Sequence, residues 1–457
     1  MSNINHPTEQ SLRTHLSASV KLGLPLVGTF ITSMLMGVTD TLMVGRLGAE
    51  PLAAAVLANQ LFFFLTIAGI GLAAGVMPLA ATALGRNDVT SMRRAVRMGF
   101  WAVLFYAFIV MPILFFAEPI YTFMGQAEPL PALAQSYLNI AMWALIPTVV
   151  VMVLRTYLSV VELANVVLFV TLAAAGLNAV LNYAFIFGHW GMPAMGLRGA
   201  AIATTGSASL SVIVLLVFAA TKKSLREHEL FVRWWRADWP AFFEVIRIGW
   251  PISMSLLAEI SLFAFSAIMV GWFGVVALAA HGIVLQIISV AFMIPLGLSQ
   301  VGTIRIGLAK GHENNAEIAM AGKAVLILGA VVACITVLVL VFLPATLVNA
   351  FIGKSNTDAA ELLSYAIPFM AIAAAFQFAD GLQVLAAGLL RGLSDTRVPM
   401  FIAVFAYWVV GVPAAYLLSQ YTNMGANGVW TGLAIGLAVA AVLATRRYLR
   451  RAVLGLV

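Results

Sequence analysis

Twelve apolar runs, each long enough to cross a lipid bilayer, leave little room for any other fold in this chain of 457 residues. A helix that spans the hydrocarbon core needs about 20 consecutive apolar residues. Lipid offers the backbone no hydrogen-bond partner, which favours helices that satisfy their own N–H and C=O groups. We therefore predict an all-α integral membrane protein with twelve transmembrane helices. We expect them over residues 18–45, 51–78, 95–117, 133–154, 163–188, 197–221, 243–271, 277–302, 321–349, 361–388, 397–419 and 427–445.

The composition excludes a water-soluble domain of this size. Hydrophobic residues make up 62% of the chain and charged residues only 9%, far from the balance found in soluble domains. The one cysteine, Cys334, lies in an apolar run, so an intrachain disulfide is impossible. The sequence shows no phosphate-binding loop, metal-ligand cluster or catalytic serine motif. We therefore expect neither enzyme activity nor a cofactor.

The positive charges are distributed unevenly between the two sides of the predicted helices. Of the 25 Lys and Arg residues, all but Arg46, Arg198 and Lys354 fall on the side that holds both chain ends. Basic residues concentrate in cytoplasmic loops, so both termini are predicted to be cytoplasmic. The net charge of +7 then anchors the chain to membrane lipid. We expect no nucleic-acid partner, because no folded soluble surface carries these residues.

The second half of the chain repeats the first. Residues 23–45 and 249–271 both begin with Gly-x-Pro and end with Met-Val-Gly. Internal repeats of this kind build many secondary transporters. We predict two six-helix lobes, at residues 1–221 and 243–457, related by a pseudo-twofold axis along the membrane normal. Further pairs match at the same spacing: Pro25 with Pro251, Gln60 with Gln286, Gly71 with Gly297, and Gly85 with Gly311.

A polar segment at residues 222–242 joins the two lobes. Three tryptophans, Trp234, Trp235 and Trp239, interleave with basic residues there. Tryptophan is typical of the headgroup level of a membrane, and Lys and Arg attract anionic lipid. We predict that this linker is amphipathic and lies on the cytoplasmic surface of the membrane.

Three carboxylates, Asp40, Glu259 and Asp380, lie well inside the predicted helices. An ionisable side chain at the bilayer centre costs at least ~2.5 kcal/mol and usually serves ion or substrate transport. One alternative is a buried ion pair that only supports packing. We find no Lys or Arg at the same depth to form such a pair, which favours cation coupling. Carboxyl groups can carry H⁺, and their oxygens can bind Na⁺, here at Glu259 and Asp380, so both ions stay open.

Polar side chains share a helix face with two of these acids. Gln377, Asp380 and Gln383 follow one another at intervals of three residues, and Ser255 lies one turn before Glu259. We predict that these neighbours line a polar pocket around the acids.

Three further polar residues lie in apolar runs. Asn178 and Asn182 are one turn apart. Two carboxamides at this spacing either bind a neighbouring helix or line a polar pocket with Asp40, and both alternatives stay open. We expect His281 to be a hydrogen-bonded interior residue rather than a proton relay.

Several motifs resemble those of the multidrug and toxic compound extrusion (MATE) transporters, most closely their bacterial NorM-like branch. These motifs are TDTLMVGRLG, LNYAFIFG, AEISLF and QFADGLQVLAAGLLRGLSDTR, and the resemblance covers essentially the whole chain. It implies a cation site at Glu259 and Asp380. It implies a second candidate site at Asp40 with Asn178 and Asn182.

The resemblance also implies a function and a location. We expect a secondary active multidrug efflux antiporter that exports amphipathic organic cations in exchange for Na⁺ or H⁺. We expect it to act as a monomer in the bacterial cytoplasmic (inner) membrane. Several Na⁺-coupled relatives have Tyr where this chain has Phe376, one turn before Asp380, which weakens the case for Na⁺. A lipid-linked saccharide flippase of the same architecture is the alternative, but the acidic mid-membrane charges favour cationic substrates.

Overall fold

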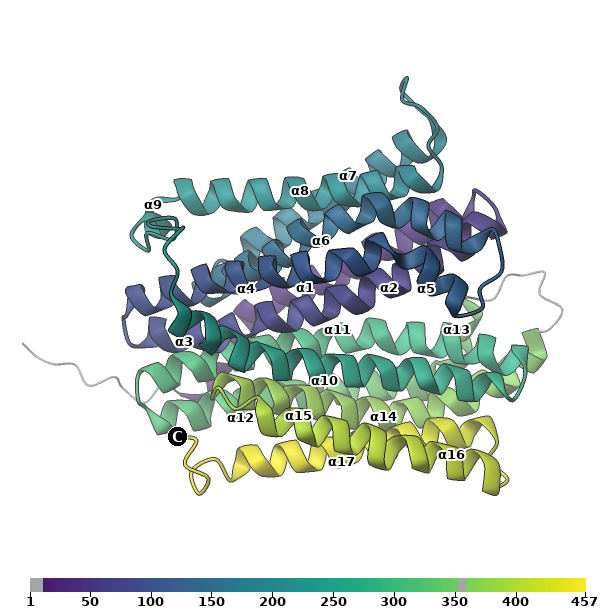
Figure 1. Ribbon diagram of the computed structural model, residues 1–457. Coiled ribbons are helices and arrows are strands. Elements are labelled where there is room, and N and C mark those ends of the chain that lie inside the picture. The colour runs from purple at the N-terminus through teal and green to yellow at the C-terminus, as the bar shows by residue number, and fades with distance from the viewer. Residues whose placement is uncertain (1–10, 352–358) are drawn as a thin grey trace, which may run out of the picture. The chain divides into compact units, whose positions relative to one another are not determined.

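The computed structural model describes residues 11–351 and 359–457, and in these ranges all regular structure is helical (Figure 1). Twelve segments there are long and apolar enough to span a membrane, which confirms the predicted fold class. Lys354, one of the three exceptions to the charge asymmetry, lies outside the described residues. The spans are α1 (Leu12–Gly45), α2 with α3 (Ala49–Ala74 and Val76–Gly85), α4 (Val89–Phe115), α6 (Leu130–Val160), α7 (Ala164–Phe187), α8 (Leu197–Thr221), α10 (Trp239–Gly271), α11 (Val275–Gly311), α12 (Asn315–Phe342), α14 (Ala359–Gly392), α15 with η1 and α16 (Arg397–Val404, Phe405–Gly411 and Val412–Tyr421) and α17 (Ala426–Leu449).

Helix ends depart from the predicted runs where polar residues continue or cap a helix. Helix α4 begins at Val89 rather than at residue 95, after Asp88, whose carboxylate accepts a hydrogen bond from the Ser91 N–H at 3.0 Å. Bonds from the Ser91 hydroxyl and N–H hold the pKa of Asp88 below its usual range. The predicted run 321–349 is divided between two helices: α12 ends at Phe342, and α13 begins at Pro344. Three short helices lie between the spans: α5 (Ala117–Phe123), α9 (Lys223–Arg226) and α13 (Pro344–Asn349).

Packing divides the chain into two compact units. The N unit is Gly28–Ser253, and the C unit is Met1–Val27 with Met254–Val457. The divisions fall inside α1 and α10, just after Pro25 and Pro251, and not in the segment 222–242 that the sequence suggests as the linker. A proline inside a helix removes one backbone hydrogen bond. Each helix therefore passes from one unit to the other near the turn in which proline removes a backbone hydrogen bond.

The repeat seen in the sequence recurs in contacts inside each unit. In the N unit, Gly71 of α2 packs against Ser253 of α10. In the C unit, Gly297 of α11 packs against Val27 of α1. The two contacts correspond residue for residue under the spacing of the repeat. A Cβ atom at either glycine would crowd backbone atoms of the other helix, so the missing side chain permits the close approach.

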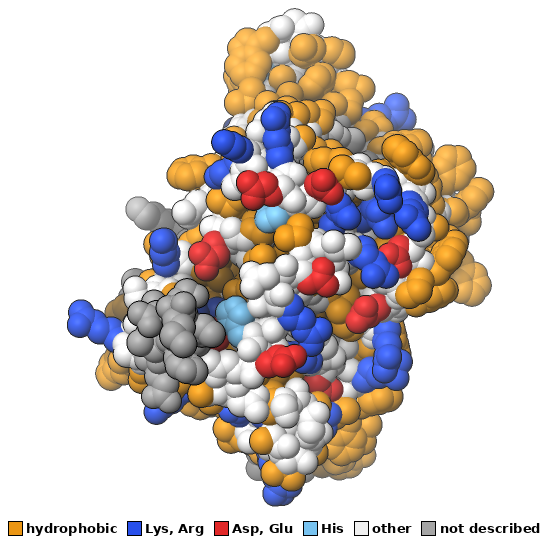
Figure 2. Space-filling view, turned by 90° about the vertical axis from the view of Figure 1, so that its left-hand side faces the viewer, with side chains coloured by type: hydrophobic (Ala, Val, Ile, Leu, Met, Phe, Trp, Pro, Cys, Tyr) orange, Lys and Arg blue, Asp and Glu red, His pale blue; other side chains and the backbone are white. Residues whose placement is uncertain are grey.

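The linker is tied to the N unit by ion pairs. Arg94 of α4 pairs with Asp238, and Arg93 pairs with Glu229 at 2.5 Å. The hydrogen bond from Arg94 holds the pKa of Asp238 below its usual range. Trp235 is 82% exposed. Charged side chains gather at the helix ends that face the viewer in Figure 2. Contact of the linker with lipid stays a prediction.

Candidate cation-coupling sites

The N unit brings Asp40 of α1 together with two amides of α7. The Asn182 Nδ2 group donates to Asp40 Oδ1 at 2.5 Å and to Asn178 Oδ1 at 3.1 Å. Both asparagines are fully buried. Their one-turn spacing in α7 places the two amides side by side, so one of them can reach the carboxylate. The bond from Asn182 joins α7 to α1, as both alternatives for the two asparagines expect, so the polar pocket with Asp40 stays a prediction.

Three residues that the sequence did not single out complete this N site. The Thr204 hydroxyl of α8 lies near the Asp40 carboxylate and donates to the Ala200 carbonyl at 3.1 Å. Tyr137 of α6 lies within reach of the Asp40 charge, and its hydroxyl donates to Asn59 Oδ1 of α2 at 2.9 Å. Each lies on a different helix from Asp40. No spacing rule within one helix could have found them.

The C unit brings together Glu259 of α10 and Asp380 of α14. The two carboxylates lie close enough for their charges to interact. Asp380 is 3% exposed, whereas Glu259 is half-buried. Like charges in a poorly solvated site repel each other. A bound cation or a proton on one carboxyl group would relieve that repulsion.

Several buried oxygens of this C site have no hydrogen-bond partner among the described residues. They are Oδ1 of Asp380 and the side-chain carbonyl oxygens of Gln377 and Gln383. These three residues share one face of α14, as their spacing predicts. Buried polar atoms are rarely left unpaired, so each such group calls for an explanation. Unpaired oxygen acceptors on the same helix as Asp380 fit the ligand preference of a hard cation such as Na⁺, and also fit water that carries a proton.

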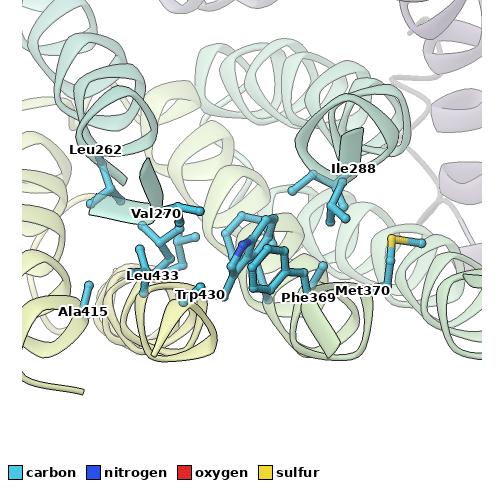
Figure 3. Close-up of a cluster of buried hydrophobic side chains, with 14 of the residues drawn as sticks. Leu262, Val270, Ile288, Phe369, Met370, Ala415, Trp430 and Leu433 are labelled. Atoms are coloured by element: carbon cyan, nitrogen blue, oxygen red, sulfur yellow. The ribbon is translucent and has the colours of Figure 1, made fainter. Parts of the chain in front are cut away.

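Aromatic side chains border the C site. The Phe376 ring, 1% exposed, lies edge-on to Trp430 at 6.1 Å between centroids. Figure 3 shows Trp430 beside Phe369, whose ring stacks on it at 5.5 Å. The His281 ring lies edge-on to Trp430 at 5.2 Å between centroids, and neither ring nitrogen has a hydrogen-bond partner among the described residues. The expectation of a hydrogen-bonded His281 is therefore wrong.

Two residues near the acids were missed in the sequence. Tyr407 lies in η1, a π-helix, and interacts electrostatically with both Glu259 and Asp380. π-Helical turns are often found at functional sites. Arg391, in the last turn of α14, interacts electrostatically with Glu259. It forms no ion pair with either acid within 4.0 Å among the described residues. Arg391 therefore does not contradict the prediction that no Lys or Arg at the same depth forms an ion pair with these acids.

Ser255 and the absence of a three-ligand metal cluster among the described residues bear on how the C site could bind a cation. Ser255 is half-buried on α10, one turn before Glu259. Across residues 11–351 and 359–457, no group of three or more His, Cys, Asp or Glu side chains is placed to hold a metal ion. A Na⁺ ion would therefore take its ligands from two carboxylates and from neutral oxygens.

A family model named MatE matches residues 25–184 and 251–417. The chain belongs to the MatE family. A probable multidrug resistance protein NorM of Rhizobium meliloti is 47% identical, with 97% of this chain and 95% of the relative covered. A protein of the same description from Agrobacterium fabrum is 42% identical, with 95% and 94% covered.

Solved structures share the fold of this MatE-family chain. One is a MOP superfamily transporter from Pyrococcus furiosus, described as having a binding pocket of reverse polarity that suggests a different function. It matches with a TM-score of 0.87 and covers 99% of both chains, at 21% identity. At that identity the likeness shows the fold and nothing of the substrate.

The two matched MatE segments follow the internal repeat. They begin at Pro25 and at Pro251, the paired prolines at which α1 and α10 pass between units. The first segment contains Asp40, and the second contains Glu259 and Asp380. The first copy of the repeat therefore carries one of these acids and the second carries two. Asp40 and Glu259 lie on the matching helices α1 and α10 but at different depths, and Asp380 lies on α14.

Proposed function

We propose that this MatE-family protein is a secondary active multidrug efflux antiporter that exports amphipathic organic cations in exchange for Na⁺ or H⁺. The observation that carries the proposal is the C site, where Glu259 and Asp380 interact beside unpaired buried oxygens. The names of the Rhizobium and Agrobacterium relatives as multidrug resistance proteins support it.

Repulsion between the two C-site acids supplies the coupling. Na⁺ or H⁺ binds and relieves the repulsion, with Gln377, Gln383 and Ser255 as further oxygen donors. Phe376 contributes only apolar contact and no cation ligand, because its ring has no oxygen. A cationic drug relieves the same repulsion, either at the acids or by favouring the conformation that has lost the ion. Exchange requires only that drug and ion prefer opposite conformations.

The N site takes a different part in this scheme. Asp40 is already hydrogen-bonded by Asn182, so its charge is stabilised without a bound cation. We propose that Asp40, Asn178 and Asn182 form a polar pocket that adjusts transport. Loss of this pocket weakens transport, whereas loss of the C site ends it.

The remaining assignments follow from the sequence and the family. The chain resides in the bacterial cytoplasmic membrane as a monomer, with both termini in the cytoplasm and the linker on anionic lipid. The six-helix lobes at 1–221 and 243–457 describe its topology. A saccharide flippase is the weaker alternative, because the acids of both sites favour cations over pyrophosphate.

Transport in proteoliposomes tests the function. Purified protein is reconstituted, ethidium is loaded, and an inward Na⁺ gradient or an inward H⁺ gradient is imposed separately. We expect one gradient to drive ethidium export and collapse of that gradient to stop it. Protein-free vesicles give the background. Ethidium movement that ignores both gradients would refute ion-coupled antiport.

A further inference from the structure

Arg155 is a buried arginine that the proposed transport does not use. It lies in α6, five residues before the end of the helix at Val160, or about 7.5 Å along the axis. Its side chain is buried, with 4% of the residue exposed. Arginine at such low exposure is nearly always paired, because desolvation of its charge is costly.

One face of the Arg155 guanidinium is fixed by an aromatic ring. Its Cζ atom lies 4.0 Å from the centroid of Phe30 in α1, and both residues belong to the N unit. A cation–π contact of this kind orients the plane of the group but uses none of its N–H bonds. The ring therefore supplies no acceptor to the edges of the guanidinium.

Two neighbouring donors on one edge have no acceptor. Nε and Nη2 of Arg155 are buried and lack a hydrogen-bond partner among the described residues. These two nitrogens carry parallel N–H bonds, which match the two oxygens of a carboxylate or phosphate. Arg155 is also absent from the ion pairs of the described chain. The orphaned atoms are therefore a complete two-point donor.

The other buried arginine of the described chain, Arg97, has a different set of partners. Arg97, also in the N unit, is 6% exposed, but its Nη1 donates to the Arg233 carbonyl at 3.1 Å and its Nη2 lies 3.9 Å from Asp238. Its only orphaned atom is Nε. Burial alone does not explain the two free donors of Arg155.

We propose that the Nε–Nη2 edge of Arg155 binds one oxyanion, either the carboxylate of a zwitterionic transported compound or the phosphate of a phospholipid. The first source rests on the proposed export function, and the second does not. With a carboxylate bound at Arg155, an amphipathic zwitterion would present its cationic amine to the remainder of the protein. Acidic and basic groups of one compound would then be recognised by different residues.

The first arm of the test compares two compounds that differ only in a carboxylate. Ciprofloxacin and its methyl ester are titrated onto purified wild type, Arg155→Lys and Arg155→Gln. A bidentate charged pair should make the wild type bind the acid about tenfold more tightly than the ester. The acid-to-ester affinity ratio should fall to about one in both variants. Gln loses the charge, and Lys keeps the charge but lacks the two parallel N–H donors of arginine. Arg86→Gln, which removes an exposed arginine, is the matched control.

The second arm follows the lipid. The same proteins are placed in nanodiscs of phosphatidylglycerol and phosphatidylcholine, and native mass spectrometry counts retained phosphatidylglycerol. Loss of one retained lipid in both Arg155 variants, but not in Arg86→Gln, assigns the site to a lipid phosphate. Loss of the acid-to-ester preference assigns it to a substrate carboxylate.

Either result supports the oxyanion site, and the absence of both overturns it. Size-exclusion profiles check folding, and if Arg155→Gln misfolds, Arg155→Lys decides. Ethidium has no carboxylate, so its gradient-driven export by the wild type tests the proposed function separately. Failure at Arg155 is thereby distinguished from failure of antiport.

Discussion

The N and C sites each contain a carboxylate in a membrane-spanning helix, but the hydrogen bonds of these carboxylates differ. Asp40 faces a donor, the amide of Asn182. Asp380 lies beside Gln377 and Gln383, whose side-chain oxygens have no partner among the described residues. Residue type therefore does not decide what an acid in a membrane protein does. What decides the role of the acid is whether its neighbours donate hydrogen bonds to it.

The difference has an energetic consequence. A buried carboxylate that accepts a hydrogen bond from an amide stays charged at a lower cost, because the bond favours the charged form. Two acids among unpaired acceptors have no such compensation, and a cation or proton is the missing partner. We therefore assign ion coupling to Glu259 and Asp380 and a supporting part to Asp40.

The largest effect is expected from removal of either C-site acid. Glu259→Gln and Asp380→Asn should each reduce ion-driven ethidium export to the background of protein-free vesicles. The double variant should be little worse than either single variant, because the two carboxylates act as one site. Both proteins should still insert, since removal of a buried repelling charge relieves a desolvation cost.

The control for this prediction is Glu361→Gln, which removes an exposed acid from the first turn of the same helix as Asp380. It should export ethidium at the wild-type rate when protein amounts are matched. Wild-type export by Asp380→Asn or Glu259→Gln would end the idea of a shared site. Additive losses would show that the two acids work independently.

A smaller effect is expected at the N site. Asp40→Asn should slow export by roughly fivefold to tenfold, at the low end of typical coupling energies, because the Asn182 amide can still donate to the new carbonyl oxygen. Insertion should be unchanged, as judged by protein amounts in the membrane fraction. Normal export would reduce Asp40 to a structural role. Complete loss would instead make the two sites equivalent and break the comparison.

The sequence revealed these sites to the extent that each lay within one helix. Gln377, Asp380 and Gln383 share a face by spacing alone, and the fold class follows from run lengths. Contacts between helices have no such signature. Thr204 of α8 and Tyr137 of α6 lie near Asp40 of α1, and Arg391 of α14 interacts with the charge of Glu259 in α10.

The division between packing units was hidden for a related reason. Hydrophobic run lengths mark where a helix enters and leaves the membrane, not which neighbours it contacts. Gly71 and Gly297 match in the sequence, but their contacts with Ser253 and Val27 become visible only in three dimensions. The sequence therefore predicted the repeat without showing that α1 and α10 each contribute to both units.

The smallest expected effect comes from one added oxygen in the C site. Phe376→Tyr places a hydroxyl on a buried ring one turn before Asp380, where unpaired oxygens already gather. An additional oxygen ligand favours Na⁺, so half-maximal transport should need roughly threefold to tenfold less Na⁺. Phe369→Tyr is the matched control, because Phe369 is equally buried on α14 and also packs on Trp430, but lies farther from Asp380 in the sequence. The shift should be the same in the Asp40→Asn background, since the added hydroxyl acts only at the C site. An unchanged Na⁺ dependence, or a shift that disappears in the Asp40→Asn background, would contradict the assignment of ion coupling to the C site alone.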